Sequence, residues 1–215
     1  MKIPDVSVID YGVGNLLSVC RAFEYFGAKV EATSDPEIIL SSPHVVLPGV
    51  GAFADGMNEL ERQGLVPIVK KVASNGTPLL GICLGMQMLL EESEEFGITA
   101  GLGLVAGKVV PVPDKTIDGK MQKIPHIGWN ELKFDIDSDN EKPNLLKNVQ
   151  PGDSVYFVHS FMAMPQDLTN IVAHCNYGGR TVTAVIRNKN VHGCQFHPEK
   201  SGAVGLNILR GFLTL

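Results

Sequence analysis

Long hydrophobic runs are absent from this sequence of 215 residues. Its longest weakly polar stretch, 77-TPLLGICLGMQMLL-90, is interrupted by glycines and is too short to span a bilayer. The N-terminal stretch 1-MKIPDVSVIDYG-12 also lacks the continuous apolar segment of a signal peptide. These absences argue against a membrane-spanning or exported protein, and we expect a soluble one.

Cysteine is scarce, and positive charge is not in excess. No two of the cysteines have the C-x-x-C spacing that is typical of structural zinc sites. A chain of this size does not need disulfides to fold, so we expect a reducing, cytoplasmic compartment. The formal net charge of -5 argues against nucleic acid or an anionic membrane as the main partner. The cysteines are Cys20, Cys83, Cys175 and Cys194.

The first part of the chain alternates short apolar strands with helical patterns. Hydrophobic residues make up 44% of the sequence, which is enough for a substantial core. The alternation predicts an α/β fold with a doubly wound, mostly parallel central sheet flanked by helices. The segment 34-SDPE-37 predicts a helix start capped by Ser34. Strands are expected at 6–10, 28–33, 44–48 and 78–82, and helices at 15–26 and 54–75, the second interrupted near Gly64.

The second part, from about Gly103 to Gln195, shows strands without long helices between them. Segments 171–176 and 181–186 read as an antiparallel hairpin, which adds an antiparallel β portion to the C-terminal half. A last helix is expected at 201–213, and the polar stretch 135–144 reads as a surface loop. With no repeat or linker in view, residues 1–215 are expected to form one domain.

Cys83 stands in the pattern Gly81-x-Cys83-x-Gly85, after an apolar strand and before a helix. One interpretation is an inert core cysteine, because free cysteines are mostly buried. The other is a nucleophile on a tight strand-to-helix turn, where glycines remove collisions and the helix N-terminus favours the thiolate. The stretch alone leaves both interpretations open.

A catalytic thiol needs a base, a residue that orients the base, and an oxyanion hole. His197 and Glu199 in 195-QFHPEK-200 fit the first two roles, although a surface turn would read the same way. For the oxyanion hole, Leu84 would supply one N–H group, and the Val50 region of the loop 48-PGVG-51 the other. An ordinary glycine-rich turn is the alternative for that loop.

The three motifs 81-GICLGMQ-87, 48-PGVG-51 and 197-HPE-199 together resemble those of the class I (triad-type) glutamine amidotransferases. That family hydrolyses glutamine through a γ-glutamyl thioester and passes the ammonia to a synthase. The resemblance implies that Cys83 is the nucleophile, His197 the base and then the acid, and Glu199 the orienting residue. It implies substrate-binding roles for Gly51, Gln87, Glu95, Ser160 and Phe161.

Within the class, 10-DYGVGN-15, 126-HIGWN-130 and 156-YFVHSF-161 are similar to the amidotransferase subunits of imidazole glycerol phosphate synthases, which act in histidine biosynthesis. Because the chain ends soon after 197-HPE-199, this resemblance implies a separate (βα)8-barrel cyclase subunit in a heterodimer, L-glutamine as substrate and no cofactor. The resemblance places Asn15, Trp129, Tyr156 and Lys200 near the subunit interface.

Other interpretations remain open at this point. Trp129 could be a core residue, Tyr156 an ordinary strand aromatic and Lys200 a solvated lysine. The partner could be an anthranilate or aminodeoxychorismate synthase, or the chain could be a γ-glutamyl hydrolase, a cysteine peptidase or a non-catalytic binding module. The remaining histidines, His44, His126, His159, His174 and His192, are expected to be structural.

Overall fold

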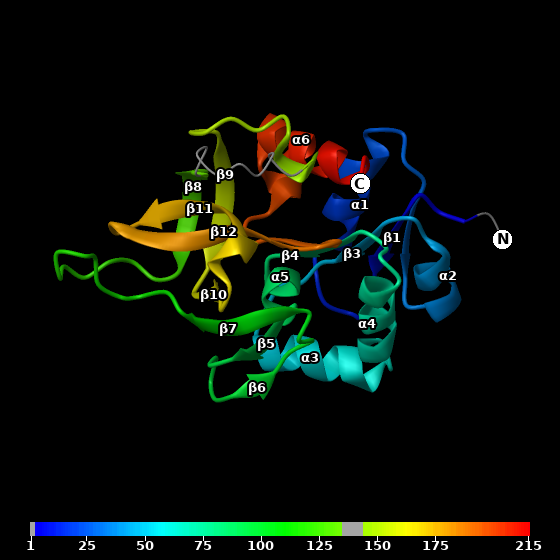
Figure 1. Cartoon of the computed structure of the whole chain (residues 1–215), viewed down its shortest axis with the longest axis horizontal. Helices are drawn as coiled ribbons and strands as arrows, with labels where there is room; N and C mark the ends of the chain where they lie inside the picture. Colours follow the sequence, from blue (N-terminus) through cyan, green and yellow to red (C-terminus); the bar gives the residue numbers. More distant parts are fainter. Residues whose placement is uncertain (1–2, 135–143) are drawn as a thin grey trace.

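The computed structural model describes residues 3–134 and 144–215. A seven-stranded sheet runs through the molecule in the order β11-β12-β13-β4-β3-β1-β2 (Figure 1). The five strands from β13 to β2 are parallel, and β11 and β12 extend the sheet as an antiparallel hairpin. The bounds are β1 Val6–Ile9, β2 Val30–Thr33, β3 Val45–Leu47, β4 Leu79–Ile82, β11 Ile171–Tyr177, β12 Arg180–Asn188 and β13 Val191–Cys194.

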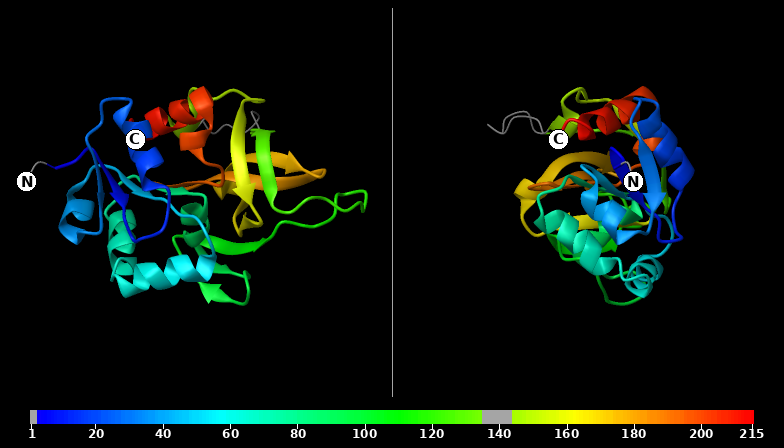
Figure 2. Two further views of the ribbon diagram at one scale, coloured as in Figure 1. Left: turned by 180° about the vertical axis from the view of Figure 1, so that it is seen from behind. Right: turned by 90° about the vertical axis from the view of Figure 1, so that its right-hand side faces the viewer.

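Helices cover both faces of this sheet (Figures 1 and 2). In β1, Val8 packs into the core under α1 and α6, whereas the next residue, Ile9, packs into the core under α3 and α4. Burial on both faces explains why these strands read as continuous apolar runs. The bounds are α1 Leu16–Glu24, α2 Pro36–Ser41, α3 Phe53–Arg62, α4 Val66–Ser74, α5 Leu84–Met88 and α6 Gly202–Phe212.

Two smaller sheets stand beside the central one. One has the order β10-β7-β5-β6, and the other pairs β8 with β9 as an antiparallel ribbon. Together with the β11–β12 hairpin they confirm the predicted α/β fold with added antiparallel strands. The bounds are β5 Leu90–Ser93, β6 Thr99–Ala100, β7 Val105–Pro111, β8 His126–Glu131, β9 Ser154–His159 and β10 Phe161–Pro165, with 3-10 turns η1 Asn144–Leu146, η2 Leu168–Asn170 and η3 Pro198–Lys200.

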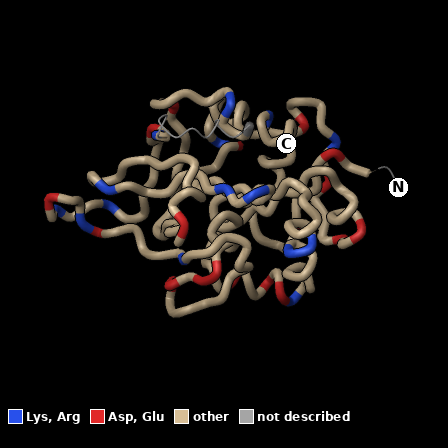
Figure 3. The backbone as a smooth tube through the Cα atoms, viewed as in Figure 1, with Lys and Arg blue, Asp and Glu red and all other residues tan. Residues whose placement is uncertain are grey.

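Local details differ from the sequence-based expectations. The N-cap of α2 is Asp35 and not Ser34, because the Asp35 carboxylate accepts a 2.8 Å hydrogen bond from the N–H of Glu37. The expected surface loop at 135–144 lies outside the described residues, apart from Asn144. Within the described ranges, no helix is long and apolar enough to cross a membrane. Figure 3 shows positive and negative residues interspersed along the chain.

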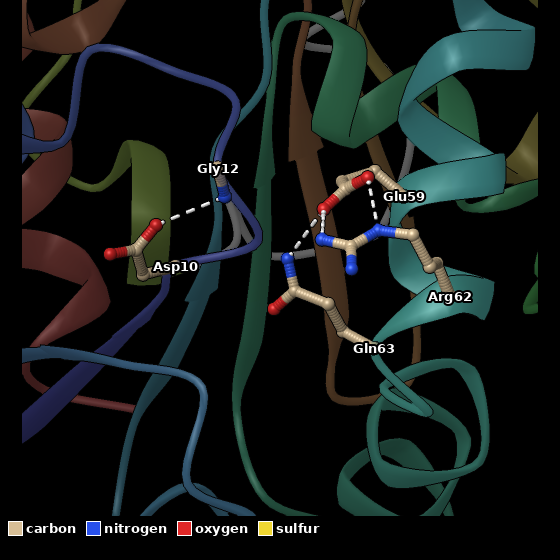
Figure 4. A network of polar contacts seen from close by, with 5 residues as sticks. All are labelled: Asp10, Gly12, Glu59, Arg62 and Gln63. Atoms are coloured by element: carbon tan, nitrogen blue, oxygen red, sulfur yellow. Dashed lines mark hydrogen bonds and ion pairs between the residues drawn. The ribbon is translucent and has the colours of Figure 1, made fainter.

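The loop after β1 lies against both α3 and the loop after β3. Asp10 accepts a 3.0 Å hydrogen bond from the N–H of Gly12 (Figure 4). A Cβ atom on Gly12 would lie 3.8 Å from Glu59 of α3, and one on Gly14 would lie 3.7 Å from Pro48. The carboxyl ends of neighbouring parallel strands therefore meet at one edge of the sheet, where such folds place their sites.

Candidate active site

Cys83 lies on a strained turn between β4 and α5. Its φ of 55° and ψ of -111° are unusual for a residue other than glycine. A Cβ atom on Gly85 would lie 1.8 Å from the carbonyl oxygen of Leu47, and one on Gly81 would lie 2.7 Å from that of Gly85. Both flanking positions therefore require glycine. The turn has the geometry expected of a nucleophile elbow.

The strand β13 brings His197 and Glu199 to this turn. The N–H of Cys83 donates a 2.7 Å hydrogen bond to the carbonyl oxygen of Cys194, the last residue of β13. Just beyond, Nδ1 of His197 lies 2.8 Å from Oε1 of Glu199, and both side chains are buried. The other oxygen of Glu199, Oε2, has no hydrogen-bond partner within the described part of the chain. The contact of Glu199 with His197 is therefore made through Oε1 alone.

The pKa of His197 is raised to about 9. Burial favours the neutral ring, but hydrogen bonds to Cys83 and to the carboxylate of Glu199, together with the charges of both groups, outweigh it. At neutral pH the ring is therefore protonated. An imidazolium beside a sulfur atom has a proton that it can give to a leaving group.

The 48-PGVG-51 loop packs directly on the elbow. A Cβ atom on Gly49 would lie 2.6 Å from the hydroxyl oxygen of Tyr11 and 3.0 Å from the Cβ of Leu84. Gly51 has a φ of 94°, which glycine adopts without strain, and Val50 is 41% exposed. The two segments expected to form the oxyanion hole are therefore neighbours, and the role of their N–H groups stays a prediction.

Glu95 and Gln87 connect the elbow to its surroundings. Oε2 of Glu95 accepts a 2.7 Å hydrogen bond from the N–H of Phe53, at the start of α3. Nε2 of Gln87, one turn into α5, lies 3.0 Å from the carbonyl oxygen of Phe161 and 3.1 Å from Oε1 of Gln195. Two of the proposed substrate-binding residues, Gln87 and Phe161, are thus in direct contact. Their contacts with substrate stay predictions, as do those of Gly51, Glu95 and Ser160.

Sequence reasoning missed two residues that contact the proposed machinery. The hydroxyl of Tyr11 donates a 2.8 Å hydrogen bond to the carbonyl oxygen of Pro48. Burial, and then the neighbouring Cys83, raise the pKa of the Tyr11 phenol. Nε2 of Gln195 lies 3.9 Å from Sγ of Cys83. Both follow the ends of strands, β1 and β13, and lie within the motifs 10-DYGVGN-15 and 195-QFHPEK-200, which were the available signal.

The residues expected at a subunit interface lie around η3. The rings of Trp129 and Tyr156, which are paired across β8 and β9, have centroids 6.1 Å apart. Trp129 is 59% exposed, so it is not a core residue. Its Cη2 atom would lie 4.0 Å from a Cβ on Gly202, just after η3, which contains the exposed Lys200. Asn15 occupies the N-cap position of α1 without a side-chain cap hydrogen bond, and this helix packs against η3. Their role in binding stays a prediction.

A strained cysteine beside a buried histidine–carboxylate pair defines a thiol-dependent site on an α/β sheet. The family model described as "Glutamine amidotransferase class-I" matches residues 7–214. The chain belongs to this family of glutamine-hydrolysing enzymes.

The curated relatives have more specific names than the family model. The chain is 54% identical over 210 residues to "Imidazole glycerol phosphate synthase subunit HisH 1" of Legionella pneumophila (strain Lens), covering 98% of this chain and 99% of that protein. It is 45% identical over 208 residues to "Imidazole glycerol phosphate synthase subunit HisH" of Geobacter sulfurreducens, covering 96% of this chain and 97% of that protein.

Solved structures share the fold at low identity. "Structure of PurLQS from Thermotoga maritima" has a TM-score of 0.73 at 20% identity and covers 99% of both chains. "Crystal structure of glutamine amidotransferase" has a TM-score of 0.72 at 17% identity, covering 98% of this chain and 97% of that chain. At these identities the likeness concerns the fold alone.

Proposed function

We propose that this chain is the glutaminase subunit of an imidazole glycerol phosphate synthase, acting in histidine biosynthesis in the cytoplasm. The observation that carries the glutaminase activity is the hydrogen bond between Cys83, on its strained turn, and His197 of the buried pair His197 and Glu199. The relatives at 45–54% identity, all named as subunits of that synthase, support the choice of acceptor. Residues 1–215 would act as one amidotransferase domain.

The chemistry begins when the Cys83 sulfur, whose proton is the one held by His197, attacks the side-chain carbonyl carbon of glutamine. The oxyanion that forms is met by the N–H of Leu84 and by one N–H from the Val50 region, each worth about 3–4 kcal/mol in such sites. Protonated His197 gives its proton to the nitrogen as the C–N bond breaks, which releases ammonia and leaves a γ-glutamyl thioester.

The second half of the cycle restores the free sulfur of Cys83 and the protonated ring of His197. Neutral His197 removes a proton from water, and the resulting hydroxide attacks the thioester carbonyl. The C–S bond breaks, glutamate leaves, and Cys83 and His197 return to their starting state. Glu199 stabilises the charged form of His197 in both halves. Every proton in these steps moves between substrate, water and the side chains named.

Glutamine would be held by groups around the sulfur. The backbone of Ser160 and Phe161 would bind the α-carboxylate, Glu95 the α-amino group, and Gln87 and the main chain of Gly51 the rest of the substrate. This assignment is supported by the contact between Gln87 and Phe161, and by the hydrogen bond that joins Glu95 to the segment following Gly51.

The partner would be a separate (βα)8-barrel cyclase subunit that docks near Asn15, Trp129, Tyr156 and Lys200. Ammonia would pass through the barrel to a phosphorylated ribulosyl nucleotide, giving imidazole glycerol phosphate and an aminoimidazole carboxamide ribotide. The exposed Trp129, packed against Tyr156, supports this location, because aromatic residues are enriched where proteins bind each other.

The test is a glutaminase assay on the chain with and without the cyclase subunit and its nucleotide ligand. We expect ammonia release to be very slow in the isolated chain and to rise steeply in the ligand-bound complex, because glutamine hydrolysis without an acceptor wastes ammonia. The Cys83→Ala variant in the same complex is the control for contaminating glutaminase. A high rate in the isolated chain, unchanged by the partner, would contradict the proposal, as would activation by an anthranilate synthase subunit in its place.

A further inference from the structure

A chain of hydrogen bonds begins on the β8–β9 ribbon and runs inward. Nδ2 of Asn130 lies 3.3 Å from Nε2 of His126. Nδ1 of His126 lies 2.9 Å from Nε2 of His159, and Nδ1 of His159 lies 2.8 Å from the carbonyl oxygen of Phe161. A carbonyl oxygen only accepts, so Nδ1 of His159 donates to it. His159 then accepts from His126, which in turn accepts from Asn130.

The same chain continues to the thiol. The carbonyl oxygen of Phe161 also accepts from Nε2 of Gln87, 3.0 Å away. That amide nitrogen also donates to Oε1 of Gln195, at 3.1 Å, and Nε2 of Gln195 lies 3.9 Å from Sγ of Cys83. Two donors thus bind the carbonyl oxygen of Phe161, which restrains the orientation of its peptide.

The two histidines of this chain are neutral, unlike His197. The pKa of each is lowered to about 4, mainly by burial. For His159 the hydrogen bond to Phe161 opposes this shift, and the nearby His126 and His197 add to it. His126 is also stacked between two rings, with centroid distances of 4.9 Å to Phe157 and 4.1 Å to Tyr177. A neutral ring with both nitrogens engaged holds one tautomer, so the direction of the hydrogen bonds is fixed.

The ribbon presents these residues and the proposed interface on opposite faces. Along β8, His126 and Asn130 bond inward, whereas Ile127 and Trp129 are 49% and 59% exposed. Side chains alternate between the two faces of a strand. A partner that displaces Ile127 and Trp129 therefore also displaces the backbone that carries His126 and Asn130.

We infer that Asn130, His126 and His159 are positioning residues for the glutamine site, which hold Phe161 and Gln87 in place and connect them to the docking face. They touch neither the sulfur nor the carbonyl carbon that it attacks. Their role in transmitting partner binding to the glutamine site rests on the proposed function. Their role in holding Phe161 requires only the glutaminase reaction. The relay explains how a partner on the outer face of β8 affects a buried thiol.

The test compares two substitutions of His126 in the assembled complex. His126→Phe keeps a ring between Phe157 and Tyr177 but removes both hydrogen bonds. His126→Asn loses the stacking but keeps a donor where Nδ1 lies. Loss of one buried hydrogen bond costs about 1 kcal/mol, so we expect His126→Phe to raise KM for glutamine about 5- to 10-fold. We expect kcat to change less, and His126→Asn to restore KM to within about 2-fold of the wild type.

His192 supplies the matched control, because it is also buried and burial also lowers its pKa to about 4. His192→Phe should leave KM unchanged. If it raises KM as His126→Phe does, or if His126→Asn fails to restore KM, the role of His126 is structural and the inference is wrong. Should His126→Phe fail to fold, Asn130→Ala serves instead, because Asn130 is only half-buried. We expect this variant to raise KM by a smaller factor, and an unchanged KM would count against the inference.

The relay has its own readout, the ratio of glutaminase rates with and without the partner. In His126→Phe this ratio should fall while the partner binds with unchanged affinity; an unchanged ratio overturns the relay. A wild-type complex that releases no ammonia from glutamine would instead overturn the proposed function. An active wild-type complex with His126→Phe indistinguishable from it would overturn only this inference.

Discussion

The hydroxyl group of Tyr11 donates a hydrogen bond to the carbonyl oxygen of Pro48 across 2.8 Å. This bond ties the loop after β1 to the first residue of the loop that lies on the elbow. At the far end of the same segment, the carboxylate of Glu95 accepts from the N–H of Phe53. Both ends of the loop are thus anchored. We therefore expect any conformational change of the loop to occur between them, at Val50 and Gly51.

Replacing Tyr11 by Phe removes the hydroxyl and leaves the carbonyl oxygen of Pro48 without that donor. We expect the free energy of unfolding to fall by about 1–3 kcal/mol, the usual cost of an unsatisfied buried acceptor. The glutaminase kcat should fall as well, because the loop loses an anchor. Urea unfolding and steady-state kinetics measure the two effects. The exposed Tyr25→Phe is the control, and a Tyr11→Phe variant that matches it in both assays would refute the anchor.

Replacing Glu199 by Gln removes the carboxylate that favours protonated His197. The pKa of His197, about 9 in the native chain, should move down toward its ordinary value. NMR titration of the His197 ring measures this shift. A pKa of His197 that stays near 9 in Glu199→Gln would show that the carboxylate does not set it, and the exposed Glu61→Gln should leave it in place.

The raised pKa of His197 also makes stability depend on pH. A histidine whose folded pKa is raised stabilises the native state fully below its unfolded pKa of about 6.5, and this contribution is lost as pH rises through about 9. Between pH 6.5 and 9 the wild type should therefore lose more unfolding free energy than Glu199→Gln does. Chemical unfolding at both pH values tests this, and equal losses would count against it.

The crowding at Gly85 predicts a severe effect of one methyl group. In Gly85→Ala the new Cβ would meet the backbone oxygen of Leu47 at 1.8 Å, so β3 and the elbow would have to separate. We expect a loss of more than about 3 kcal/mol of stability, at the upper end for overpacked sites. Gly56→Ala is the matched control, because its nearest neighbours are the flexible side chains of Met88 and Leu84. Similar melting temperatures for the two variants would contradict the crowding.

Buried neutral histidines predict a loss of stability in acid. The pKa values of His126 and His159 are lowered to about 4, so their contribution is present above about pH 6.5 and is lost as pH falls toward 4. Each histidine that takes up a proton only on unfolding lowers the free energy of unfolding by up to about 1.4 kcal/mol for each pH unit of acidification. Urea unfolding from pH 7 to 4.5 should show a shallower fall for His126→Phe than for the wild type. Parallel curves would mean that His126 is not held neutral.

Local patterns predicted the elements of the fold and the most specific part of the site. The glycines around Cys83 avoid steric clashes within the turn itself. His197 and Glu199 are two residues apart, so their hydrogen bond also depends on local sequence. The position of the α2 cap was wrong by one residue, since Ser34 and Asp35 are both good caps and only the backbone geometry decides between them.

Contacts between distant segments could not be predicted in the same way. Gln195 reaches Cys83 only because β13 pairs with β4, and nothing in the sequence of either strand specifies that pairing. His126 and His159 were interpreted as structural histidines. Their burial agrees with that interpretation, but their link to Phe161 depends on the β8–β9 pairing and on the turn into β10.

The central claim is that Cys83 carries the glutaminase reaction, and a glutamine-analogue diazoketone tests it most directly. The ligand-bound complex is incubated with the reagent, and the modified residue is identified by mass spectrometry while ammonia release is followed. We predict stoichiometric labelling of Cys83, with none at the other cysteines, and loss of ammonia release in step with labelling. An active complex in which Cys83 stays unlabelled, or a Cys83→Ala complex that still releases ammonia from glutamine, would contradict the account.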